Sequence, residues 1–271
     1  MFGYKFSRPT KAIAILLSLF SLDQSPSVAE AIAIPRNSSV GNPPNETLVM
    51  YWQADNPLAT LVLIPGGEGR VNLSPSQKSL NNQFYRSVKM LSDKAQSKGN
   101  INVVVFDNPY DMPSNPSGYP DTRASIDHLS RIESVVQFFR KKTGKPVLLM
   151  GHSNGAVSVT EYIRYINKAG KSNSVQGIIL SSSRNGSYID SRMSTKALVL
   201  HHSKDACRNS TSDASNNLYN SIRRHNGART EMKNLESGIS EGGNPCRGGF
   251  HMFNGGGQEL SKAIEGFILR N

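Results

Sequence analysis

Residues Pro146–Gly155, "PVLLMGHSNG", join two kinds of element through one tight turn. The apolar run at their start is typical of a strand buried on both faces, and an amphipathic helix from about Asn154 to Lys168 follows. Gly-x-Ser-x-Gly between a strand and a helix is the pattern of a nucleophile elbow, with Ser153 as the nucleophile. An ordinary glycine-rich turn is the alternative. The strand before the turn and the helix after it favour the elbow.

Apolar strands and amphipathic helices alternate on both sides of this turn. We expect strands at Thr47–Gln53, Ala59–Pro65, Ile101–Asp107, Pro146–Met150, Val175–Ser183, Lys196–His202 and, near an edge, Ala228–Leu235, with the first two as neighbours. We expect helices near Gln77–Ala95, Arg123–Thr143, Asn154–Lys168, Asn216–His225 and Gly255–Leu269. This alternation predicts an α/β fold with a mostly parallel central sheet and helices on both faces. In such sheets the chemistry gathers at the carboxyl ends of the strands.

The start of the chain resembles an export signal. Three basic residues precede the apolar run Ala12–Leu22, and small residues at cleavage spacing follow at Ala29–Ala33. The run is shorter than the roughly 20 apolar residues of a spanning helix, so we expect cleavage rather than a membrane anchor. We therefore predict a signal peptide over residues 1–31, a linker rich in Pro, Asn and Ser over residues 32–46, and one domain over residues 47–271. The protein is then periplasmic or secreted.

The chain is strongly basic, with a formal net charge of +11. Such a charge draws a protein toward anionic surfaces or substrates, although solubility alone is an equally good explanation. No run of consecutive Lys or Arg and no cluster of aromatic and basic residues points to nucleic acid. We expect no nucleic-acid partner.

Residues 65–68, "PGGE", follow one of the expected buried strands. An acyl-transfer nucleophile needs backbone N–H donors where negative charge develops. We expect the first donor to be the N–H of Asn154, directly after Ser153, and the second to be that of Gly67, with Glu68 as the alternative. A plain turn is the alternative. A phosphate-binding loop would carry a lysine followed by Ser or Thr, which this stretch lacks, and no cofactor is expected.

The stretch "HHSKDAC", residues 201–207, places Asp205 just after an expected late strand. An elbow serine on such a sheet is followed in the chain first by an acid and then by a histidine. Asp205 is our first choice for the acid. Asp190 is the fallback, and Asp213 lies further into the next segment.

His251, in "GGFHMF", lies before the final helix and is the expected base. It would contact Ser153 through one ring nitrogen and Asp205 through the other. His128 and His225 fall on helices and are expected at the surface. His152 is too close to the nucleophile in sequence to act as the base and is expected to pack.

The two cysteines lie beside the expected acid and base. Cys207 follows Asp205 closely, and Cys246 shortly precedes His251. A disulfide between them would tie the two loops together, and this pairing is a hypothesis from their spacing. A zinc site from His201, His202, Asp205 and Cys207 is a weaker alternative, because adjacent strand residues point to opposite faces. We expect no metal.

These motifs together resemble the α/β-hydrolase superfamily, and within it a group of small exported bacterial hydrolases. The resemblance covers the chain from about Thr47 to its end. It implies a serine nucleophile that forms an acyl-enzyme, and it does not imply which acyl group is cleaved.

The sequence indicates less about the substrate than about the reaction. Only "SSSRNGSYIDSRMST" separates two late strands, so we expect no large cap domain. The Pro-rich segment Asn108–Thr122 is expected to form a rim, with Tyr110, Met112 and Tyr119 available to line a pocket. We expect an open site that acts on small or exposed esters. A peptidase, amidase or acyltransferase with the same triad is an alternative, as is a non-catalytic binding module.

Overall fold

The computed structural model describes residues 29–37, 44–93, 100–112, 121–171, 174–189, 193 and 195–270. Most of the expected signal peptide, Tyr119 in the expected rim and the fallback acid Asp190 lie outside these residues. The end of the expected helix Gln77–Ala95 also lies outside them.

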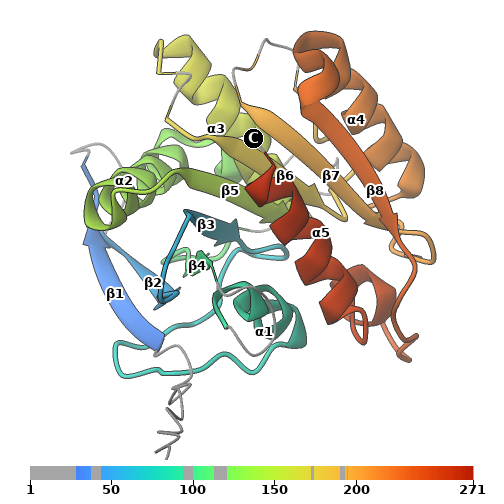
Figure 1. The fold of residues 1–271 in the computed structure, drawn as a ribbon, viewed down its shortest axis with the longest axis horizontal. Helices are drawn as coiled ribbons and strands as arrows, with labels where there is room; N and C mark the ends of the chain where they lie inside the picture. Colours follow the sequence, from blue (N-terminus) through green and yellow to red (C-terminus); the bar gives the residue numbers. More distant parts are fainter. Residues whose placement is uncertain are drawn as a thin grey trace, which may run out of the picture.

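The described residues form one twisted sheet of eight strands in the order β1-β2-β4-β3-β5-β6-β7-β8 (Figure 1). The strands are β1 (Ala29–Pro35), β2 (Glu46–Trp52), β3 (Ala59–Ile64), β4 (Ile101–Phe106), β5 (Val147–His152), β6 (Gly177–Ser181), β7 (Lys196–His202) and β8 (Thr230–Leu235). The strands from β4 to β8 are parallel, whereas β1 and β2 pair antiparallel at one edge. The α/β class and the mostly parallel sheet are confirmed. The expected neighbours β2 and β3 are separated by β4.

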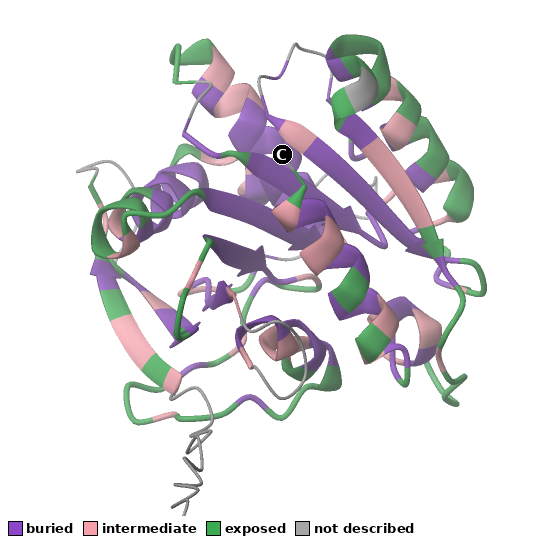
Figure 2. Cartoon of the chain, viewed as in Figure 1, coloured by how far each residue is buried: buried purple, intermediate pink, exposed green. Residues whose placement is uncertain are grey.

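Helices cover both faces of the sheet. They are α1 (Gln83–Lys89), α2 (Ile126–Thr143), α3 (Asn154–Lys168), α4 (Ser212–Asn226) and α5 (Gly257–Leu269), with short 3-10 turns η1 (Met90–Ser92), η2 (Asp121–Ala124), η3 (Gly227–Arg229) and η4 (Gly249–Met252). Apolar side chains of α2, α3 and α4 pack on one face, and those of α1 and α5 pack on the other. The central strands are buried between these layers (Figure 2). Their continuous apolar sequences follow from burial on both faces.

Some elements differ from the sequence expectation in length or orientation. Helix α1 begins only at Gln83, because the Asn82 side chain accepts a hydrogen bond from the Phe84 N–H (2.9 Å) and so caps the helix there. Ile126, an apolar residue, is 53% exposed because it is the first residue of α2. The connection from β6 to β7 spans only residues 182–195, which leaves no room for a cap domain.

Residues 32–35 of the expected linker are instead part of strand β1. Ile34 pairs with Thr47 on β2 and is 2% exposed, whereas the rest of β1 is at most partly buried. The strand forms because "AEAIAIP" alternates in the period that suits a half-exposed edge strand. Domain structure therefore begins before residue 47.

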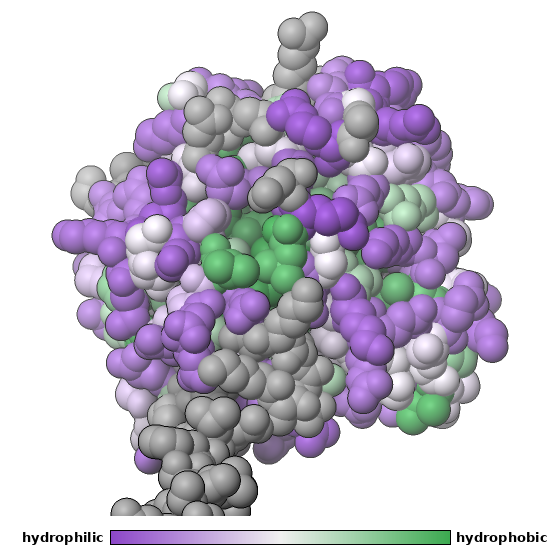
Figure 3. Space-filling view, viewed as in Figure 1, coloured by the Kyte–Doolittle hydropathy of each residue, from purple (hydrophilic) through white to green (hydrophobic). Residues whose placement is uncertain are grey.

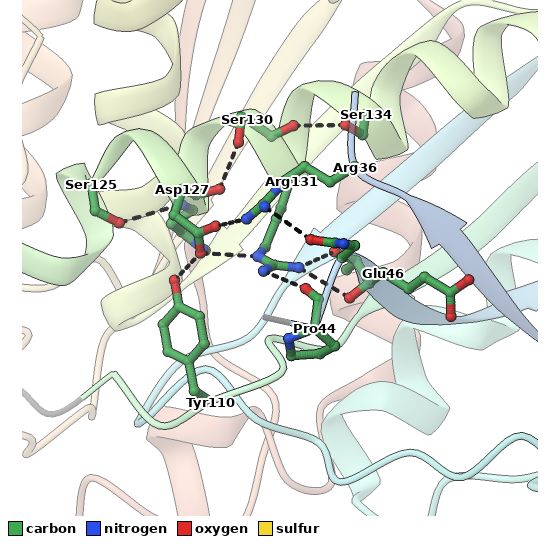
Figure 4. Close-up of polar contacts among 12 residues, drawn as sticks. Arg36, Pro44, Glu46, Tyr110, Ser125, Asp127, Ser130, Arg131 and Ser134 are labelled. Atoms are coloured by element: carbon green, nitrogen blue, oxygen red, sulfur yellow. Dashed lines mark hydrogen bonds and ion pairs between the residues drawn. The ribbon is translucent and has the colours of Figure 1, made fainter. Parts of the chain in front are cut away.

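A buried ionic cluster fastens the end of β1 to helix α2 (Figure 4). The Asp127 carboxylate accepts hydrogen bonds from Arg36, from Tyr110 and from Arg131 Nε, the last at 3.0 Å. Arg131 also donates to the carbonyl oxygens of Pro44 (2.7 Å) and Glu46 (3.0 Å). Burial alone would raise the pKa of Asp127, but the hydrogen bonds from Arg131 and Tyr110 hold that pKa below its ordinary value. The carboxylate therefore stays ionised. From helix α2 it bonds to Arg36 after β1 and to Tyr110 in the segment expected to form the rim.

One hollow lies at the amino ends of the strands, around Leu58, Leu148 and Ile268, with a volume of about 670 Å³. Figure 3 shows apolar atoms over β3, surrounded by hydrophilic residues. Two cations at this hollow are already satisfied: Lys196 donates to the Phe267 carbonyl (2.9 Å) and Arg229 to that of Met193 (3.1 Å). The titratable groups described below lie at the opposite edge. Among the described helices, none is long and apolar enough to cross a membrane.

Candidate active site

Ser153 lies at the tight turn between β5 and α3 in a strained conformation, with φ 53° and ψ −119°. A Cβ on Gly151 would lie 2.3 Å from the Gly155 carbonyl oxygen, and a Cβ on Gly155 would lie 2.1 Å from that of Ile64. Both positions therefore require glycine. The Ser153 N–H donates to the Ser181 carbonyl on β6 (2.9 Å), which fixes the turn to the sheet. The geometry matches the elbow expected from the sequence.

Asp205 and His251 meet at the same edge of the sheet. His251 Nδ1 lies 2.8 Å from Asp205 Oδ2, and the two side chains are 1% and 0% exposed. Asp205 Oδ1 accepts from the Cys207 N–H (2.9 Å), so both carboxylate oxygens are oriented. The bond at Nδ1 fixes the ring and leaves Nε2 as the nitrogen available for proton transfer.

The structure also brings His251 near the turn that carries Ser153. The His251 ring centroid lies 5.1 Å from that of His152, the residue directly before Ser153. Between Ser153 and His251, both in the described part of the chain, no hydrogen bond is formed. In free enzymes this contact is often long and tightens only with substrate. His152 is 2% exposed and packs on Phe84 with ring centroids 4.2 Å apart, so its expected packing role is confirmed.

A disulfide joins Cys207 to Cys246, as their spacing suggested, with Cα atoms 4.7 Å apart. Cys207 follows Asp205 on the acid loop, and Cys246 precedes η4, which carries His251. The bond links the two loops next to the contact between Asp205 and His251. It does not involve the turn that carries Ser153.

The loop after β3 lies directly on the elbow. A Cβ on Gly66 would lie 2.9 Å from the His152 carbonyl oxygen and 3.0 Å from Ser153 Cβ. Gly67 has φ 54° and is exposed, and its carbonyl accepts from the Asn154 side chain (2.8 Å). The loop that carries residues 66 and 67 is thus held against Ser153 and the start of α3.

Arg123, which the sequence reasoning missed, holds this loop from beneath. Its guanidinium is fully buried and donates to the carbonyls of Pro65 (3.1 Å) and Gly67 (2.9 Å). Burial lowers the pKa of Arg123 to about 9, which leaves it charged at neutral pH. A basic residue near the start of a helix interacts unfavourably with the helix dipole. This position was the feature of the sequence that could have indicated a structural role for Arg123.

A chain of buried polar groups continues from Arg123. Arg123 Nη1 donates to Ser158 Oγ (2.8 Å). Because Asn108 Oδ1 can only accept, the Nδ1–H of His128 donates to it (3.3 Å), and Nε2 of the neutral ring accepts from the Ser158 hydroxyl (2.9 Å). His128 is fully buried, so its expected surface position is wrong. Burial, followed by the Arg123 charge, lowers the pKa of His128 to about 3. The ring is therefore neutral, with Nδ1 as a hydrogen-bond donor and Nε2 as an acceptor.

The expected rim residues have structural roles where they are described. The Tyr110 hydroxyl is bonded to Asp127. Met112 is fully buried, and its N–H donates to the Glu68 carbonyl (2.9 Å). Met112 therefore supports the loop after β3 from below and does not line an open pocket.

The adjacent histidines at the end of β7 point to different sides. His201 Nδ1 bonds to Ser215 Oγ on α4 (3.1 Å), whereas the His202 ring stacks on Phe250 at 4.5 Å between centroids. Cys207 is in the disulfide, and Asp205 is bonded to His251. Among the described residues, no three His, Cys, Asp or Glu side chains lie where they could share a metal ion.

Comparison with known proteins places the fold. No family model and no curated protein sequence matches the chain. A serine hydrolase without lid from Xanthomonas campestris superposes with a TM-score of 0.54 at 15% identity, covering 88% of this chain and 94% of that one. A dienelactone hydrolase from Anabaena variabilis gives 0.57 at 9% identity, covering 90% and 97%. An esterase from Rhizomucor miehei gives 0.52 at 12% identity, covering 78% and 74%. The chain has the α/β-hydrolase fold.

Proposed function

We propose that this protein is a serine hydrolase that cleaves small or exposed carboxylic esters through Ser153, His251 and Asp205. The observation that carries the proposal is the buried bond between His251 and Asp205 at the sheet edge where Ser153 occupies a strained elbow. A binding protein has no need for a strained serine beside an oriented imidazole. The similarity to esterases in fold agrees with the proposal.

The proposed reaction has two halves. His251 Nε2 takes the proton of Ser153 Oγ as the oxygen attacks the ester carbonyl carbon, and Asp205 stabilises the imidazolium. The N–H of Asn154 and that of Gly67 or Glu68 stabilise the oxyanion. The tetrahedral intermediate expels the alcohol, which receives the proton from His251. Water then attacks the acyl-enzyme with His251 again as the base, and the acid is released with Ser153 restored.

Labelling with a fluorophosphonate probe tests this function. The probe forms a phosphonyl ester with an activated serine and loses fluoride, so the wild type should be labelled and Ser153→Ala should not. Ser183→Ala, which removes a buried serine hydroxyl beyond β6, is the matched control and should retain labelling. The proposal would be refuted if the wild type, shown by circular dichroism to be folded, is not labelled.

A series of 4-nitrophenyl esters tests the acyl preference. The connection of residues 182–195 offers no cap to enclose a long chain. We therefore expect kcat/KM to peak at short acyl groups, and an optimum at long chains would contradict the proposed preference. Matched anilides separate ester cleavage from amide cleavage.

We also propose that the protein is exported, as its first residues suggest. The disulfide Cys207–Cys246 supports this, because such bonds persist in oxidising compartments. N-terminal sequencing of the protein from a periplasmic or culture fraction should find cleavage within Ala29–Ala33. An intact N-terminus in the cytoplasmic fraction would contradict it.

A further inference from the structure

Arg184 lies just beyond β6, at the same edge of the sheet as the nucleophile. Its backbone N–H donates to the carbonyl oxygen of Ser153 (3.2 Å), and its own carbonyl accepts from the Ser187 N–H (3.0 Å). The backbone of Arg184 is therefore fixed to that of Ser153. A side chain as long as arginine can reach a group bound to the serine hydroxyl.

The Arg184 guanidinium has no hydrogen bond or ion pair with any described residue, although the side chain is partly buried. The exposed Glu68 carboxylate on the adjacent loop does not pair with it either. Other arginines of the described chain reach carboxylates: Arg36 and Arg131 contact Asp127, Arg164 contacts Glu161, and Arg270 contacts Glu231. A partly buried guanidinium that no described residue pairs is able to bind an anion that a ligand supplies.

The charge of Arg184 also acts on the site. It contributes to the lowered pKa of Arg123, after the larger effect of burial, so the two guanidinium groups lie within electrostatic range. Burial lowers the pKa of Arg184 itself. Arg123 is occupied by the carbonyls of Pro65 and Gly67, so of these two described guanidinium groups Arg184 is the one available to a ligand. The net charge of +11 would draw an anionic substrate toward the molecule.

We propose that Arg184 binds a carboxylate at the far end of the acyl group, so that the preferred substrates are monoesters of dicarboxylic acids. The inference rests on the proposed ester hydrolysis. The planar fork of an arginine matches both oxygens of a carboxylate and forms charge-assisted hydrogen bonds with it. Arg184 is then a specificity-determining residue that acts on the acyl group held at Ser153.

A matched pair of substrates tests this role. The mono-4-nitrophenyl ester of adipic acid carries a free carboxylate, and 4-nitrophenyl methyl adipate is its neutral counterpart. We expect wild-type kcat/KM to be at least about tenfold higher for the anionic ester, as for a charge-assisted hydrogen bond. Arg184→Gln should remove most of this ratio, largely through KM, and Arg184→Lys should restore part of it. Arg208→Gln, which removes an exposed charge from the neighbouring acid loop, should preserve the ratio.

The outcomes separate the inference from the proposed function. Ser153-dependent hydrolysis of both esters with equal kcat/KM would overturn the inference and leave the hydrolase intact. Equal loss of the ratio in Arg184→Gln and Arg208→Gln would overturn it too, because general electrostatic attraction would then suffice. If neither ester is hydrolysed, titration calorimetry of monomethyl adipate with Ser153→Ala, with and without Arg184→Gln, still reads out the carboxylate site. Binding that needs Arg184 supports the inference, and no difference refutes it.

Discussion

The two halves of the site are held together by different kinds of interaction. On the nucleophile side, the loop after β3 rests on the buried chain Arg123, Ser158 and His128. On the acid and base side, two loops are joined by the disulfide Cys207–Cys246. The first half is held by a chain of buried hydrogen bonds, and the second by a covalent bond beside the contact between Asp205 and His251.

This difference separates the two halves energetically. Removing one member of a buried polar chain leaves its partners unsatisfied in a low dielectric, so the loss spreads along the chain. Removing a disulfide mainly enlarges the freedom of the unfolded chain, and the native contact between Asp205 and His251 can persist. Substitutions in the buried polar chain near Ser153 should therefore lower activity more than stability. Loss of the disulfide should lower stability more than activity.

The largest effect on activity is expected from Arg123→Met. The change releases the carbonyls of Pro65 and Gly67, so the amides beside Ser153 lose their fixed positions. We expect kcat/KM for a 4-nitrophenyl ester to fall about 10²–10³-fold, as when an oxyanion donor is lost. Arg140→Met, an exposed arginine of α2, should stay within about twofold, as usual for surface substitutions. A small loss in Arg123→Met would show that the loop holds without its support.

The second prediction concerns the disulfide. Replacing Cys207 and Cys246 by serine should lower the free energy of unfolding by about 3–4 kcal/mol, because the bond closes a loop of 39 residues. Below the unfolding transition, kcat/KM should fall less than about tenfold, since Asp205 and His251 remain in contact. Urea unfolding and initial rates measure the two effects. A reductant should reproduce them in the wild type and leave the serine variant unchanged. A large activity loss with unchanged stability would reverse the comparison.

The third prediction concerns the pH dependence of stability in His128→Gln. The folded pKa of about 3 lies below the ordinary value, so the unfolded chain binds the extra proton more readily. Stability from this group is complete above about pH 6.5 and is lost as pH falls toward 3, by up to about 1.4 kcal/mol per pH unit. Urea unfolding between pH 4 and pH 7 should show a shallower slope in His128→Gln, and His225→Gln, at an exposed position, should keep the wild-type slope. An unchanged slope in His128→Gln would mean that the ring is not held neutral.

The elbow, the sheet class and the cysteine pair could be predicted from the sequence. Each follows from residues close together in the chain or from one repeated alternation of strands and helices. Arg123 was missed and His128 was misplaced at the surface because their partners lie far away in sequence. Pro65 directly follows β3, and Ser158 lies on α3. The insertion of β4 between β2 and β3 depends equally on long-range packing. Strand β1 was missed for another reason, since its small alternating residues also suit a cleavage site.

The position of β1 has a kinetic consequence for the proposed export. The expected cleavage region Ala29–Ala33 pairs with residues 48–52 of β2, so its backbone is held within the sheet once the fold is complete. A peptidase needs an extended, accessible chain, which means that cleavage must come before this edge closes. Ile34, Arg36 and Asn37, which anchor the segment, all lie beyond the expected cut. The processed chain would thus keep its anchor and lose only the outer part of the strand. Cleavage by the peptidase would then compete with the pairing of β1 and β2.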